Sequence, residues 1–122
     1  EVRAGTHRWT VRLAATAQAD YRDILRWTVA QFGPAQAQVY AETLGAALEA
    51  LAGGPKITGA RARIDIATGL FTLHVARRGR KGRHFVMFRI VSEQGREVID
   101  VLRLLHDAMD LQRHLPPIEE RE

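Results

Sequence analysis

The stretch His84-Phe-Val-Met-Phe-Arg-Ile-Val91 decides how this chain folds. It is largely apolar and is interrupted once, by Arg89, which is typical of a strand in the middle of a buried sheet. A second apolar run, Val98–Leu105, follows a short segment, Ser92–Gly95, with the composition of a hairpin turn. These two runs predict a pair of antiparallel strands at the centre of the domain.

The chain before this pair predicts another strand and two helices. Trp9–Leu13 alternates like a short strand, and Thr16 can cap a helix that ends at Phe32. Gly33-Pro34 ends this helix and starts a second one, which Gly53-Gly54-Pro55 stops. An apolar stripe on the first helix predicts that it packs on the second as an antiparallel hairpin. The stripe consists of Ala17, Tyr21, Ile24, Thr28 and Phe32.

Leu70–Val75 predicts one more strand, whereas residues 57–68 have no sustained period and indicate a loop or an irregular edge strand. The predicted fold is therefore α+β. It consists of an N-terminal strand, an antiparallel helical hairpin, and a three-stranded antiparallel sheet that ends in a short helical turn, from His106 to Leu115. We expect one domain over residues 9–115, with tails at 1–8 and 116–122.

The composition excludes several classes of protein. A chain of 122 residues is expected to form one domain with one core. The absence of cysteine excludes disulfides and thiolate chemistry, and it favours the cytoplasm as the location. No run of about 18 apolar residues could span a bilayer, and no leader is visible at the N-terminus. We therefore expect no contact with a membrane.

The charge points to an acidic partner. The net charge is +4 and the isoelectric point is near 10.3. Lysine occurs only at Lys56 and Lys81, so nearly all the positive charge is arginine, whose planar guanidinium suits carboxylates and phosphates. The codon composition of a GC-rich genome would also explain the many arginines.

A basic turn precedes His84. Without interleaved aromatic residues to stack on bases, it indicates either a solvated hairpin tip or a contact for nucleic-acid phosphates. Its cations are Arg77, Arg78, Arg80, Lys81 and Arg83.

His106 and Asp110 would share one face of a helical turn, as a metal site could require. No further ligand stands at a fixed spacing from them, so we expect no metal and no cofactor.

The order of these segments resembles the ParE branch of the RelE/ParE superfamily of toxins. In the central strands the resemblance rests on the motifs FRI, at 88–90, and LRLLH, at 102–106. In the helices it rests on Asp20, Ile24, Trp27, Thr28, Phe32, Gly33, Ala37, Tyr40 and Leu44. It covers about residues 9 to 115, and the segment 57–69 departs from the family pattern by its length. The resemblance implies a growth-inhibiting toxin, a cognate antitoxin as its partner and DNA gyrase as its target.

Relatives of the RelE branch instead cut messenger RNA on the ribosome, and a shared fold does not decide between the two activities. Ribonucleolytic members use several Lys or Arg side chains on the sheet and usually a Tyr or His near the chain end. Here no Tyr follows Tyr40, and the sheet face offers mainly Arg89 and Arg103. We therefore expect no catalytic residue. An mRNA endonuclease is the alternative, with His106 as general acid or base unless His106 merely bonds to the next turn or to Asp110.

Two groups of residues are candidates for binding. The candidates for contact with the inhibited target are Arg89, Arg103, His106, Asp110 and Arg113. The candidates for contact with the antitoxin are Trp27, Val39 and Thr43 on the helical hairpin. Val39 points away from the core face, which invites a partner, although single exposed aliphatic residues also occur on surfaces that bind nothing.

Overall fold

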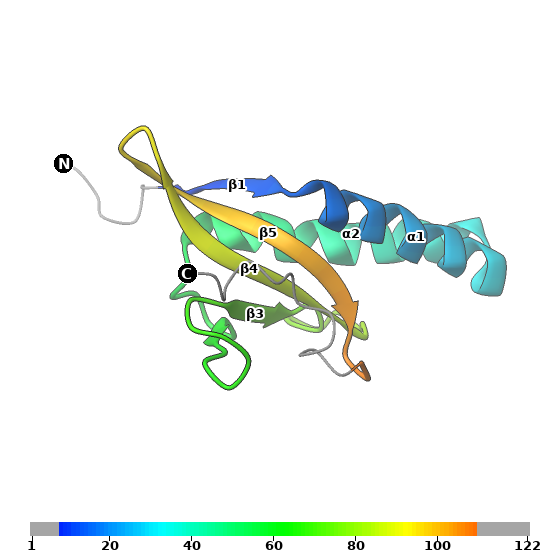
Figure 1. The fold of residues 1–122 in the computed structure, drawn as a ribbon. Coiled ribbons are helices and arrows are strands. Elements are labelled where there is room, and N and C mark those ends of the chain that lie inside the picture. The colour runs from blue at the N-terminus through cyan, green and yellow to red at the C-terminus, as the bar shows by residue number, and fades with distance from the viewer. Residues whose placement is uncertain (1–7, 110–122) are drawn as a thin grey trace.

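The structure is a computed structural model that describes residues 8–109. Two helices cover one face of a five-stranded sheet with the strand order β1-β5-β4-β3-β2 (Figure 1). The long central hairpin is formed by β4 (His84–Glu93) and β5 (Arg96–His106), which confirms the strand pair predicted from the two apolar runs. The predicted α+β class is also confirmed.

The sheet is mixed and contains more strands than predicted. β1 (Thr10–Leu13) joins it by pairing in parallel with β5, whereas the sequence predicts three antiparallel strands beside a separate N-terminal one. β3 (Phe71–His74) pairs antiparallel with β4, and β2 (Arg61–Ala62) adds a two-residue edge. A parallel pair requires a long crossover, and the chain between β1 and β5 supplies it.

The two helices form the predicted antiparallel hairpin. α1 (Ala15–Phe32) ends at Gly33, whose φ of 93° suits glycine and whose N–H donates to Val29 O. α2 (Pro34–Ala50) starts with a proline and ends in a 3₁₀ turn, η2 (Leu51–Gly53). Within the described residues, no helix is both long enough and apolar enough to span a membrane.

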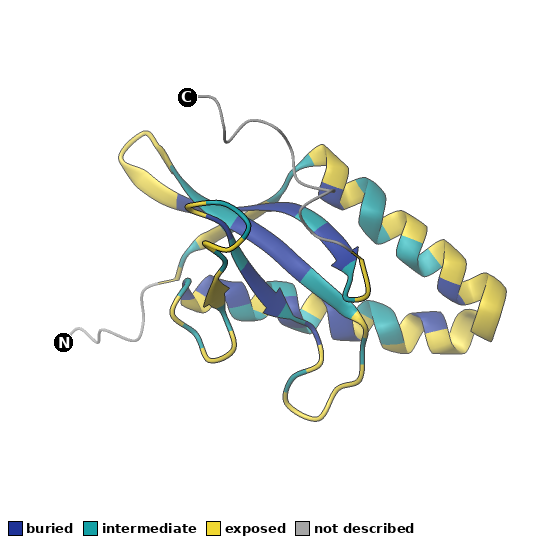
Figure 2. Ribbon diagram, turned by 60° about the horizontal axis from the view of Figure 1, so that its bottom comes forward, coloured by how far each residue is buried: buried dark blue, intermediate teal, exposed yellow. Residues whose placement is uncertain are grey.

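Two details of the first helix differ from the prediction. The N-cap residue is Ala14, and Thr16 does not cap the helix but donates its hydroxyl proton to Leu102 O, 2.8 Å away. Phe32 is 65% exposed and is not part of the core stripe. The hairpin extends past the sheet, so its last turns have no strand to pack on (Figure 2).

The core has two parts, one on each face of the sheet. The larger part lies under the helices and includes Leu44, Phe88 and Ile99, all fully buried. The smaller part lies on the opposite face and includes Leu70, Met87 and Leu105, with Ile66 packed against it. Residues 61–67, predicted as an irregular edge, therefore contribute both β2 and a cover for this second face.

After His106 the chain turns, with Met109 N–H donating to His106 O at 3.0 Å. The rest of the predicted helical turn, from Asp110 to Leu115, lies outside the described residues, as do the tail 116–122 and most of the tail 1–8.

Side chains of α1 form hydrogen bonds with the backbone groups on the outer edge of β5, at the positions where β1 no longer pairs with it. The parallel ladder ends at the pair Leu13–Val101. Beyond it, Leu102 O accepts from Thr16, and Leu104 N–H donates to the Asp20 carboxylate at 2.9 Å. The same carboxylate binds the Arg103 guanidinium through two hydrogen bonds of 2.8 and 3.0 Å. Asp20 thus joins α1 to the central strand.

We predict that Asp20→Ala lowers the free energy of unfolding by about 2 to 3 kcal/mol, because it removes the carboxylate that binds Arg103 and the acceptor of the Leu104 N–H. The control is Asp23→Ala on the same helix. It removes an exposed ion pair with Arg26 and should cost less than about 0.5 kcal/mol. Urea unfolding of both variants measures the difference, and equal losses would show that Asp20 does not hold the helix on the strand.

Candidate functional site

Three histidines meet at one end of the sheet, where β3 ends, β4 begins and β5 ends. His74 is the last residue of β3, and His84 faces His106 across the central pair. The rings of His84 and His106 lie edge to face with their centroids 5.3 Å apart. Strand pairing alone therefore gathers imidazoles from three strands at one place.

Tyr40 connects this end of the sheet to α2. Its hydroxyl oxygen accepts the Arg83 N–H at 3.1 Å and lies 2.7 Å from Nδ1 of His84. We assign the proton in this bond to the Tyr40 hydroxyl, because its oxygen already accepts the Arg83 N–H and the buried His84 ring is neutral. Burial, followed by the neighbouring His106, lowers the pKa of His84 to about 4. Burial also raises the pKa of Tyr40, so both groups are neutral at pH 7.

The carboxylate of Asp107 joins His74 to Arg83. Oδ2 accepts the Nε2–H of His74 at 2.9 Å, and Nε of Arg83 lies 3.1 and 3.2 Å from the two carboxylate oxygens. Arg83 first and His74 second lower the pKa of Asp107 to about 2. Asp107 in turn raises the pKa of Arg83. The cluster consists of Tyr40, His74, Arg83, His84, His106 and Asp107, and we call it the sheet-end cluster.

Every histidine of the sheet-end cluster uses Nδ1 as an acceptor. His74 Nδ1 accepts the Ala76 N–H at 3.0 Å, and His106 Nδ1 accepts the Ala108 N–H at 3.1 Å. Since His84 Nδ1 accepts from Tyr40, the ring proton of each neutral histidine is on Nε2. The one basic lone pair of each ring is therefore occupied. A general base needs that lone pair, so proton abstraction here would first break a hydrogen bond.

The same hydrogen bonds leave no imidazole lone pair for a metal ion. Among residues 8–109, no group of three or more His, Cys, Asp or Glu side chains is arranged to hold one.

The described residues among the candidates for target contact are separated from one another. Arg103 is held by Asp20, whereas Arg89 lies near Asp100, with 3.5 Å between Nε and Oδ2. Asp100 is buried and also binds Arg12. His106 belongs to the sheet-end cluster and its side chain is 42% exposed. The remaining two candidates, Asp110 and Arg113, lie outside the described residues.

The candidates for antitoxin contact differ in exposure. Trp27 is 58% exposed and Val39 is 50% exposed, and both belong to the part of the hairpin near its tip. Phe32, which was assigned to the core, contacts Trp27 edge to face, with ring centroids 5.9 Å apart. Thr43 is only 2% exposed, because its hydroxyl turns back to Val39 O and accepts from Arg80. Thr43 therefore offers no surface of its own.

Most of the sheet-end cluster is not evident from the sequence. The pairing of 70–75 with 84–91 places His74 opposite Phe85, and the register of the central pair places His84 opposite His106. These two strand registers could have revealed the histidines. Tyr40 has no such signal, because it comes from the middle of a helix far away in the chain.

The fold is that of solved toxin–antitoxin proteins. The chromosomal ParDE system from P. aeruginosa matches with a TM-score of 0.63 and 22% identity, covering 82% of this chain and 97% of that one. The toxin–antitoxin complex RelBE2 from Mycobacterium tuberculosis matches with a TM-score of 0.52 and 19% identity, covering 81% of this chain and 98% of that one. The chain therefore shares its fold with these two solved structures.

The sequence comparisons point to a narrower group than the fold does. The family model described as "ParE toxin of type II toxin-antitoxin system, parDE" matches residues 11–111. Toxin ParE1 of Mycobacterium tuberculosis, in strains H37Rv and CDC 1551 / Oshkosh, is 33% identical over 103 residues, which cover 84% of this chain and 94% of the relative. The chain belongs to the ParE toxin family of type II toxin–antitoxin systems. The predicted family is confirmed.

We predict that acid destabilises the protein between pH 6.5 and about 4 through His84. In this range the unfolded chain binds a proton at His84, whose ordinary pKa is 6.5, whereas the folded chain does not until about pH 4. Stability therefore falls as the pH is lowered. His84→Gln should remove most of this slope in urea unfolding at a series of pH values.

The control is His106→Gln, which should keep most of the slope, because burial, the larger cause of the lowered pKa of His84, is unchanged. At lower pH, protonation of Asp107 adds a separate loss, because its pKa is lowered to about 2 in the folded chain. A slope that is equal in the wild type and in His84→Gln would contradict the assignment of a neutral, buried His84.

Proposed function

We propose that this ParE-family toxin inhibits growth by binding and poisoning DNA gyrase, and that a cognate antitoxin neutralises it. The observation that supports inhibition by binding is the occupied Nδ1 of every histidine in the sheet-end cluster. Cleavage of RNA requires a group that removes the 2′-hydroxyl proton, and here each imidazole already accepts a hydrogen bond.

The arginines of the sheet support the same proposal. Arg103 is bound through two hydrogen bonds to Asp20, and Arg83 is bound to Asp107. A cation that stabilises a cleaved phosphate must be free to face it. These two guanidinium groups instead neutralise carboxylates within the protein.

An mRNA endonuclease of the RelE type is the second candidate. It is favoured by the gathering of Tyr40, three histidines and Arg83 at one end of the sheet, which are the residue types that such chemistry uses. For these residues to act, the bond between His106 Nδ1 and the Ala108 N–H, or the corresponding bond of another histidine, would have to open.

We predict that the purified protein blocks supercoiling by gyrase or accumulates gyrase-cleaved DNA, and that it leaves messenger RNA intact in a translating extract. His106→Asn is the informative variant, because the Asn side-chain oxygen can still accept the Ala108 N–H while it cannot transfer protons. Since His106 is also a candidate for contact with gyrase, this variant is used only in the RNA assay, where neither it nor the wild type should cleave messenger RNA. A codon-specific cleavage pattern that His106→Asn abolishes, with gyrase unaffected, would establish the endonuclease instead.

The antitoxin is proposed to cover the exposed apolar side chains near the tip of the helical hairpin. Trp27, Phe32 and Val39 are each at least half exposed. Large aromatic side chains of this kind commonly contribute most of the binding energy at protein interfaces. Thr43 is left out of this surface because it is buried.

We predict that the double change Trp27→Asp and Val39→Asp weakens binding of the cognate antitoxin by roughly tenfold or more, because it places charges where apolar contacts form. The control is Ile64→Asp, which alters an equally apolar side chain that is 76% exposed, on the segment that follows β2. Titration calorimetry measures both. Unchanged affinity in the double variant, or an equal loss in the control, would remove the hairpin from the interface.

A further inference from the structure

A basic cleft lies apart from the sheet-end cluster, between the last turns of α2 and the turn after β3. Its volume is about 660 Å³, and Ile57 and Val75 are among its lining residues. In the described part of the chain, one carboxylate lines it, that of Glu49, which is paired with Arg8 at 2.7 Å. The cations of this cleft are Arg8, Lys56, Arg77, Arg78 and Arg80.

Two of these cations are held in place by neutral groups. Arg77 Nη2 donates to Thr58 O at 3.1 Å, and Arg80 Nη1 donates to the Thr43 hydroxyl oxygen at 3.4 Å. Within the described residues, neither pairs with a carboxylate, and the same is true of Lys56 and Arg78. Four positive charges thus surround one cleft without a counter-charge from this part of the chain, which favours a bound anion.

Arg78 occupies a backbone position that suits other residues better. Arg80 N–H donates to Arg77 O at 3.0 Å across a turn in which φ is 53° at Arg78 and 82° at Gly79. Such a turn with two positive φ angles favours Asn or Gly at its first central position. An arginine occupies this position despite the unfavourable backbone conformation, and its side chain adds positive charge to the cleft.

The lining distinguishes between two kinds of anionic partner. An acidic peptide normally needs an apolar anchor pocket in addition to charge. The large exposed apolar residues of the described chain are Trp27, Val29, Phe32, Val39, Ile64 and Met109, and none of them lines the cleft. Recognition of a nucleic-acid backbone needs only cations that neutralise phosphates. Among residues 8–109, no aromatic side chain lines the cleft to stack on bases.

We propose that the basic cleft binds the phosphate backbone of a nucleic acid without reading its bases. The site is independent of the proposed inhibition of gyrase, because it requires only the cations around the cleft.

The test uses fluorescence anisotropy of the purified full chain with three labelled probes of one sequence: duplex DNA, single-stranded DNA and RNA. Binding to at least one probe is expected, and its affinity should fall with salt with a logarithmic slope of about −3, as expected when three to four phosphates are neutralised. The three probes identify the source of the backbone. No binding to any probe at low salt would overturn the proposal.

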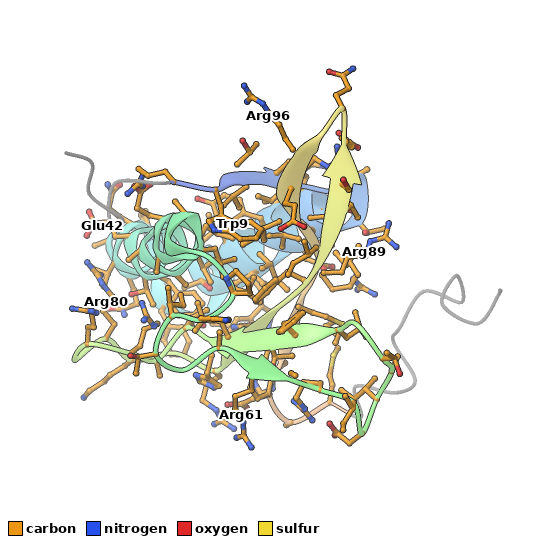
Figure 3. All side chains as sticks on the ribbon, turned by 90° about the vertical axis from the view of Figure 1, so that its left-hand side faces the viewer. Trp9, Glu42, Arg61, Arg80, Arg89 and Arg96 are labelled. Carbon is orange, nitrogen blue, oxygen red and sulfur yellow. The ribbon has the colours of Figure 1, made fainter. Side chains whose placement is uncertain are left out.

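The variant Lys56→Glu with Arg78→Glu should lower the affinity by roughly tenfold or more and flatten the salt slope. The control, Arg61→Glu with Arg96→Glu, changes the net charge equally at exposed positions that lie away from Arg80 (Figure 3). It should retain most of the affinity. An equal loss in the control would show attraction by net charge alone and would overturn the site.

Arg78→Gly separates binding from folding. Because glycine adopts a positive φ without strain, this variant should bind more weakly while its melting temperature stays the same or rises. A lower melting temperature would show that Arg78 is structural. A poly-glutamate competitor that displaces the nucleic acid at an equal or lower charge concentration would indicate an acidic protein ligand and would also overturn the proposal.

Discussion

The fold depends on how the backbone N–H and C=O groups on the outer edge of β5 find hydrogen-bond partners after β1 has ended. β5 loses its parallel neighbour at Val101, and an unpaired strand edge in the middle of a protein is costly. Thr16 and Asp20, one helical turn apart on α1, take over by binding Leu102 O and Leu104 N–H. The register of the central pair shifts between Met87 and Phe88, so Leu102 has no residue opposite it, and its carbonyl is the one that Thr16 reaches. The helical layer is thereby fixed on the sheet.

This arrangement decides which charged groups remain available for function. Asp20 binds Arg103, and Asp100 lies between Arg12 and Arg89, so the arginines of the central strands mostly serve the fold. At the end of the sheet, Arg83 is likewise bound by a carboxylate of the protein, that of Asp107. Arg80 and Arg89 lie on opposite sides of the molecule (Figure 3), and Arg80 lines the basic cleft together with Lys56, Arg77 and Arg78. The proposals of inhibition by binding and of a phosphate-binding cleft both follow from this division.

The sequence predicts the elements well because their signals are local. Apolar runs define β4 and β5, and Gly33-Pro34 defines the helical hairpin. Contacts between distant elements were not predicted. Tyr40 reaches His84 because α2 lies over the end of the sheet, and Thr16 binds Leu102 where a cap was expected. Phe32 has the spacing of a core residue but extends beyond the sheet, and Thr43 turns inward although it belongs to a face expected to bind a partner. Such outcomes depend on where each helix ends relative to the strands, and periodicity does not encode that.

The central claim is that His74, His84 and His106 each use Nδ1 as a hydrogen-bond acceptor, so that none of these three imidazoles offers a free lone pair to a substrate. Long-range ¹H–¹⁵N correlation spectra of the imidazole rings test it most directly, because protonated and unprotonated ring nitrogens resonate apart. At pH 7 we expect His74, His84 and His106 each to show a protonated Nε2 and an unprotonated Nδ1. A protonated Nδ1 in His84 or His106 would contradict the account, because a basic lone pair would then be free on Nε2.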